Sequence, residues 1–136
     1  MSNAPCVDIC TLLNANGFGT LGTDLFGMEW GTVGDDPIDQ QTLVIDTEGF
    51  SSEQKNAYEH ITFQILFRGD KRESGKDVYD RARLVHLFLI DSSDSVTINS
   101  TEYLGFEPQS NLAPLGPDSE ERYIYSMNYF TFRNPE

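Results

Sequence analysis

NLAPLGPDSEERYIYSMNYFTFR, from Asn111 to Arg133, carries the strongest structural signal in the chain. A loop rich in Pro and Gly leads through an acidic turn into one long strand that begins at Tyr123. Large side chains alternate along this strand, with Tyr123, Tyr125, Met127 and Tyr129 on one face and Ile124, Phe130 and Phe132 on the other. We therefore expect one face to pack on the chain's own core and the other to be covered by a neighbouring molecule. The pattern indicates a protein whose function is assembly.

The composition is that of a folded and strongly acidic protein. Its 136 residues suffice for one hydrophobic core, so we expect a single domain over residues 1–136. A hydrophobic content of 38% and an aromatic content of 12% exclude a disordered chain. With 9 basic and 22 acidic residues the net charge is −13, which disfavours an outer surface that grips DNA or RNA. An acidic surface can still line a conduit, where it repels DNA.

The two cysteines and the apolar segments indicate a protein that is neither exported nor embedded in a membrane. Cys6 and Cys10 are spaced for one face of a helix, where disulfide geometry is poor, so we expect reduced thiols in a reducing compartment. No N-terminal apolar run resembles a signal peptide, and no stretch approaches the roughly 20 apolar residues of a membrane span.

Two helices are predicted. The first spans about residues 5–16, with Asn3 as its N-cap, Gly17 at its end and an apolar stripe of Val7, Cys10 and Leu13. The second spans residues 77–89. Its apolar face consists of Val78, Ala82, Val85 and Leu89, widened by Leu84 and Phe88, while Asp77, Asp80, Arg83 and His86 face away.

Strands are predicted between and after these helices. The clearest is 61–67, in which Ile61, Phe63, Ile65 and Phe67 share one face. Shorter strands are expected at 25–30, 43–45, 96–98 and 103–106, and exposed loops at 32–41 and 107–122. The predicted fold class is α+β, with one mixed, largely antiparallel sheet and two helices packed on one face.

One segment matches a nucleotide-binding motif in its residue letters but not in its structural context. Residues 17–22 read G-x-G-x-x-G, but the glycines follow a helix and precede a strand, the reverse of the dinucleotide fingerprint. The helix end that faces them is the negative one, which repels phosphate. We interpret the glycines as a helix C-terminus and a turn.

No catalytic or metal-binding pattern stands out. Asp35, Asp36 and Asp39 lack the oxygen spacing of a calcium loop, as do Asp91 and Asp94, and a solvated acidic turn accounts for each set. His60 and His86 have no positioned nucleophile, and Cys10 lies on a stripe expected to be buried. We expect a protein that is not an enzyme and that has no catalytic residue, cofactor or metal.

Charge is distributed unevenly. Six of the nine basic residues lie within 68–83, whereas the stretch 24–59 is acidic. A solvated helix with local pairs such as Asp77–Arg81 accounts for the basic cluster equally well. The alternative is a basic edge that meets the acidic edge of the next copy, a head-to-tail contact that closes a ring. The candidate interface residues are Arg68, Lys71, Arg72, Arg81, Arg83, Asp35, Asp36, Asp39, Tyr125 and Tyr129.

Several motifs, taken in order, resemble one protein family. They are the glycine segment 17–27, Val44-Ile-Asp-Thr-Glu-Gly49, Gln64-Ile-Leu-Phe-Arg-Gly69, Val78-Tyr-Asp-Arg-Ala82, and the turn 116–122 that leads into Met127-Asn-Tyr129. Over nearly its whole length the chain resembles the tail-terminator proteins of long-tailed bacteriophages, also described as minor capsid or head–tail joining proteins. It departs from them at residues 34–39, which are acidic where a more neutral, Pro-rich segment is expected.

The resemblance implies a structural virion protein that forms a ring, a hexamer, at the head-proximal end of the tail after assembly in the host cytoplasm. The ring caps the tail tube, stops its polymerisation and presents a docking surface to the head connector. Its expected partners are further copies of itself, the tail-tube protein and a connector or stopper protein, while DNA passes through the lumen without specific binding. Candidate partner contacts lie in the loop that holds Pro108, Pro114, Pro117 and Asp118.

Two alternatives remain open at this stage. The nearer one is a tail-tube or head-completion protein of the same structural set, and a tube protein would stack into filaments. The more distant one is a small metal-dependent phage enzyme that uses the acidic loop, which would bind divalent ions.

Overall fold

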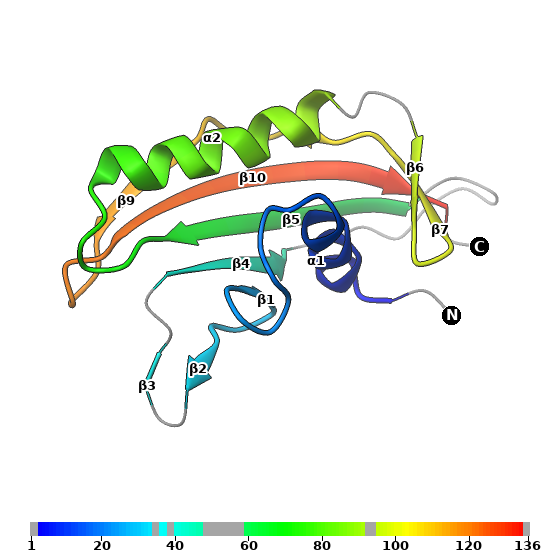
Figure 1. The fold of residues 1–136 in the computed structure, drawn as a ribbon. Coiled ribbons are helices and arrows are strands. Elements are labelled where there is room, and N and C mark those ends of the chain that lie inside the picture. Colours follow the sequence, from blue (N-terminus) through cyan, green and yellow to red (C-terminus); the bar gives the residue numbers. More distant parts are fainter. Residues whose placement is uncertain (1–2, 34–35, 38–39, 48–58, 92–94, 135–136) are drawn as a thin grey trace.

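Two helices and one large sheet make up most of the structure, a computed structural model that describes residues 3–33, 36–37, 40–47, 59–91 and 95–134 (Figure 1). The helices are α1 (Pro5–Ala15) and α2 (Gly75–Asp91). The strands are β1 (Leu25–Gly27), β2 (Thr32–Val33), β3 (Asp36–Pro37), β4 (Gln41–Asp46), β5 (Glu59–Arg68), β6 (Ser95–Ile98), β7 (Thr101–Leu104), β8 (Glu107–Pro108), β9 (Ala113–Pro117) and β10 (Tyr123–Arg133).

The antiparallel pair β5–β10 forms the centre of the sheet. Its register runs from Ile124 opposite Arg68 to Arg133 opposite Glu59. The strand order is β1-β4-β5-β10-β7-β6, and β8 and β9 also pair with β10, whereas β2 and β3 form a separate hairpin. Because β1 is parallel to β4 and the other pairs are antiparallel, the sheet is mixed and largely antiparallel, as predicted.

Both helices pack on the same face of this sheet (Figure 1). Alternation along β5 directs Phe63, Ile65 and Phe67 to that face, and the register of β10 places Met127 and Tyr129 beside them. The predicted stripe of α2 is confirmed: Val78, Ala82, Val85 and Leu89 are all buried, together with Ile9, Cys10 and Leu13 of α1. The predicted α+β class with two helices on one face is therefore confirmed.

The ends of α1 differ in how well they were predicted. Gly17 adopts a positive φ of 81°, and the N–H groups of Gly17 and Phe18 donate to the carbonyls of Asn14 and Leu13, which is a Schellman ending. The predicted Asn3 N-cap is wrong, because the cap residue is Ala4 and has no side-chain cap bond. The carboxylate of Asp46, at the end of β4, instead accepts the N–H of Cys6 at 2.8 Å.

Some predicted element boundaries and faces are also wrong. The loop expected at 107–122 contains β8 and β9, which Pro and Gly had obscured, and the loop expected at 32–41 contains a hairpin and the start of β4. The strand expected at 25–30 ends at Gly27. Val7 and Leu84 lie on exposed helix faces, with 39% and 62% of their surfaces exposed, rather than on the core stripes.

Candidate assembly interface

The face of the sheet opposite the helices carries large apolar side chains. On β10 these are Ile124 and Phe130, both half-buried, and Phe132, which is 40% exposed. Leu66 of β5 and Ile45 of β4 face the same way and are half-buried. Among the residues that β4, β5 and β10 direct to this side, the single charged side chain is the buried Arg68. This second face of β10 is the surface that the sequence pattern predicts a neighbouring molecule to cover.

An aromatic cluster lies at one end of this face. The rings of Phe130 and Phe132 are 6.2 Å apart, and the ring of His60 lies 5.4 Å from Phe130 and 5.1 Å from Phe132. Such contacts hold the rings in fixed positions before any partner arrives, which lowers the entropic cost of binding.

The segment that follows β1 covers one corner of the same face. The ring of Trp30 stacks over the guanidinium of Arg68 at 4.4 Å, and the ring of Phe26 packs so closely on Gly31 that a side chain there would collide with it. Gln41 fixes this segment by hydrogen bonds to the N–H and the carbonyl of Gly31. Arg68, a predicted interface residue, is thereby buried within its own chain and is left out of the interface proposed below.

The remaining basic candidates fall into two groups. Lys71 pairs with Glu120 at 3.3 Å, and Arg81 pairs with Glu73 rather than with Asp77 as the local-pair interpretation predicts. Arg72 and Arg83 are exposed, and neither guanidinium makes an ion pair with any residue in the described parts of the chain.

Of the acidic and tyrosine candidates, the structure describes the side-chain surroundings of the two tyrosines. Asp35 and Asp39 lie outside the described residues, and Asp36 is described only as part of the backbone of β3. Tyr125 is half-buried, with its ring 5.6 Å from that of Tyr79, whereas Tyr129 has no exposed surface. Tyr129 therefore belongs to the core, and its predicted place in the interface is wrong. Alternation shows which side chains share a strand face, but it does not show how much of that face the rest of the chain covers.

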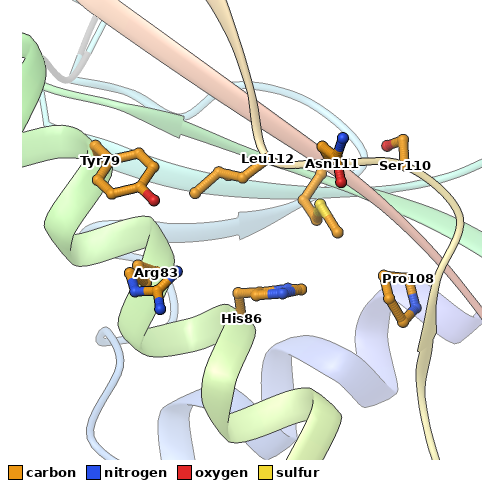
Figure 2. A pocket seen from close by; sticks show the side chains of 8 residues that line it. Tyr79, Arg83, His86, Pro108, Ser110, Asn111 and Leu112 are labelled. Carbon is orange, nitrogen blue, oxygen red and sulfur yellow. The ribbon is translucent and has the colours of Figure 1, made fainter.

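A pocket of about 260 Å³ separates α2 from the segment that joins β8 to β9 (Figure 2). Tyr79, Arg83 and His86 line it from α2. Pro108, Ser110, Asn111 and Leu112 line it from the facing segment, and Met127 of β10 also lines it. His86, expected on a polar helix face, is half-buried, and its Nδ1 lies 3.0 Å from the hydroxyl of Tyr129. Burial, aided by the positive charge of Arg83, lowers the pKa of His86 and favours the neutral imidazole.

The candidate contact loop is more ordered than its composition predicts. Pro108, Pro114 and Pro117 are exposed and belong to β8 and β9, which pair with β10. Asp118 organises the turn that follows, because its carboxylate accepts the N–H groups of Glu120 and Arg122 and the Nε–H of Arg122, each at 2.9 Å. Although burial opposes the charged form, these bonds outweigh it and lower the pKa of Asp118.

Neither a metal site nor a membrane-spanning helix is formed by the parts of the chain that the structure describes. Over these residues, no group of three or more His, Cys, Asp or Glu side chains is placed to hold a metal ion. No helix among them is both long enough and apolar enough to cross a membrane.

The model of a known protein family matches residues 12–131 of the chain. The family is described as bacteriophage tail terminator protein. No curated protein matches the chain. The matched region begins within α1 and ends within β10, so it includes all of α2, the strands β1 to β9 and β10 as far as residue 131. The chain therefore belongs to the bacteriophage tail terminator family, whose members are structural proteins of the phage tail.

Proposed function

We propose that this protein forms a ring, a hexamer, that caps the completed tail tube, stops its polymerisation and provides the docking surface for the head connector. Membership of the tail terminator family supports a role in the phage tail and therefore a place in the virion. The observation that carries the ring itself is the apolar second face of the sheet, which a single chain leaves partly exposed.

Charge explains why this face is the contact between copies. Every copy carries a net charge of −13, so two copies repel each other wherever their acidic surfaces meet. The strands β4, β5 and β10 direct one charged side chain to this face, the buried Arg68, and the exposed Glu107 of β8 lies beside Phe130 at its margin, so apolar burial there can supply the affinity. Exposed ion pairs are worth only about 0–1 kcal/mol each, so charges set the register and rate of association instead.

Termination requires that the two faces of the ring differ. One ring face pairs with the last ring of tube subunits, and the other lacks the edge that a further tube subunit would recognise. We assign the exposed prolines of β8 and β9 and the turn at Asp118 to the contact with a tail partner, because they project at the margin of the sheet. The acidic charge of the ring lets DNA slide through the lumen without specific binding.

The pure protein provides the first test. Sedimentation should show one discrete oligomer, and electron microscopy should show single rings that do not stack. Filaments of stacked rings would instead identify a tail-tube protein. A monomer at all concentrations would contradict the ring, and stoichiometric binding of divalent ions would favour the enzyme alternative.

A further inference from the structure

Arg83 stands at the pocket between α2 and the β8–β9 segment, and no carboxylate among the described residues pairs with it (Figure 2). The other basic side chains with described surroundings, apart from Arg72, each have a partner. Lys71, Lys76, Arg81, Arg122 and Arg133 pair with carboxylates, and Arg68 stacks on Trp30. In a chain with 22 acidic and 9 basic residues, Arg83 and Arg72 are thus the two basic residues with described surroundings for which the described structure shows no such partner, and of the two only Arg83 lines this pocket.

The walls of the pocket complement a carboxylate on a short apolar stem. Ser110 and Asn111 bring a hydroxyl and an amide, which can both donate hydrogen bonds, and Arg83 brings a planar guanidinium suited to bidentate pairing. Leu112 and Met127 offer apolar surface to methylene groups. Figure 2 shows that the side chains of α2 and those of the facing segment lie on opposite sides of one space.

We propose that this pocket binds the carboxylate side chain of an Asp or Glu from a second copy of this chain. Charge complementarity identifies the occupant. The chain carries 13 more acidic than basic residues, so each copy has carboxylates that no basic residue of its own can pair with. The inference rests on the proposed assembly and adds to it a specific contact, in which a desolvated pair at the pocket fixes the register of neighbouring copies.

His86 stands next to Arg83 and offers a second ring-nitrogen contact to an occupant of the pocket. Its imidazole is hydrogen-bonded to Tyr129 on the inner side and lies next to Arg83. An arriving carboxylate neutralises the field of Arg83, which is one of the two factors that disfavour a charged imidazole. The carboxylate can accept a hydrogen bond from an N–H group of Arg83 or of His86.

Zero-length cross-linking of the Arg83→Lys variant tests the inference. The substitution keeps a positive charge and provides an amine that a carbodiimide couples only to a carboxylate in direct contact. Copies labelled with ¹⁴N and ¹⁵N are unfolded, mixed and refolded together before coupling, and mass spectrometry then identifies the joined peptides. Lys76, which contacts Asp80 at 2.6 Å within its own chain, provides the control that yields products of one isotope only.

We expect isotopically mixed products that join position 83 to an Asp or Glu peptide. We also expect Arg83→Gln to weaken assembly by roughly tenfold, since a charge-assisted contact is lost. Rings that form without mixed products at position 83 would overturn the pocket contact and leave the ring intact. Mixed products in small oligomers without rings would keep the pocket contact and overturn the ring.

Discussion

Arg133, near one end of the chain, and Asp8, near the other, meet in the interior, with Nη1 of the arginine 4.0 Å from Oδ2 of the aspartate. The hydroxyl of Tyr103 lies between them, donating to Asp8 and 3.3 Å from Nη1 of Arg133. Arg133 also donates to the carbonyl of Asn3 at 2.8 Å and to the carboxylate of Glu59 at 3.2 Å. This network ties α1 to the last strand of the sheet.

We predict that Asp8→Ala destabilises the protein by about 1–3 kcal/mol, because it leaves the buried hydroxyl of Tyr103 without its acceptor, while Arg133 keeps its contact with Glu59. Urea unfolding followed by circular dichroism measures the change. Asp80→Ala is the matched control, since Asp80 pairs with Lys76 at an exposed site and its loss should leave the unfolding midpoint unchanged. Equal losses in the two variants would contradict the structural role of the network.

Replacing two neighbouring residues of α2 by Asp should change the stability of the protein by very different amounts. Val85 is 1% exposed and Leu84 is 62% exposed. Val85→Asp places an uncompensated charge in the core and should lower the free energy of unfolding by more than about 3 kcal/mol. Leu84→Asp should leave thermal stability nearly unchanged. If both variants melt at the same temperature, the orientation of α2 in this structure is wrong.

The two thiols should be unreactive, and their ionisation should lower the free energy of unfolding at alkaline pH. Burial, aided by Asp46, raises the pKa of Cys6 from 9.0 to about 11, and burial raises that of Cys10 from 9.0 to about 12. Because the folded state holds these protons more tightly, their contribution is complete below pH 9 and is lost as pH rises toward 11. A Cys6→Ala/Cys10→Ala double variant should lose less stability than the wild type between pH 8 and pH 10.5 in urea unfolding. Parallel losses in the two proteins would contradict the shifts.

The uncovered face of the sheet gives a prediction about assembly. Phe132→Asp should abolish the ring while the monomer stays folded, because it places a charge within the aromatic cluster of the proposed contact and does not reach the core. Analytical sedimentation and circular dichroism measure the two properties separately. Leu84→Asp, an exposed apolar position on the helical side, serves as the control and should still form rings. Normal rings of Phe132→Asp would place the contact elsewhere.

Sequence periodicity was enough to predict the elements that alternate strongly. Strand β10 begins and ends where the pattern of 123–133 predicts, and the buried stripe of α2 is also the predicted one, because burial of one face imposes a regular pattern. Strands β8 and β9 were missed since Pro108, Pro114 and Gly116 are typical of loops, yet edge strands tolerate them.

Contacts between residues that lie far apart in the chain could not be predicted from the sequence. Asp8 looks like an ordinary polar residue on a helix, and only the fold brings Arg133 to it. Arg68 belongs to a basic cluster in the sequence, but a turn elsewhere in the chain lays Trp30 over it. The pocket beside Arg83 could not be predicted either, because it depends on how the β8–β9 segment lies against α2. Local patterns specify which face is buried and not which distant residue covers it.

Electron microscopy of growing tail tubes can show whether the ring ends a tube. Tail-tube protein is allowed to polymerise with and without this protein, and tube lengths and tube ends are recorded. We predict that tubes stop lengthening when the protein is added and that each stopped tube carries one ring at a single end. Tubes that continue to grow, or rings that stack on one another beyond the tube end, would contradict the account.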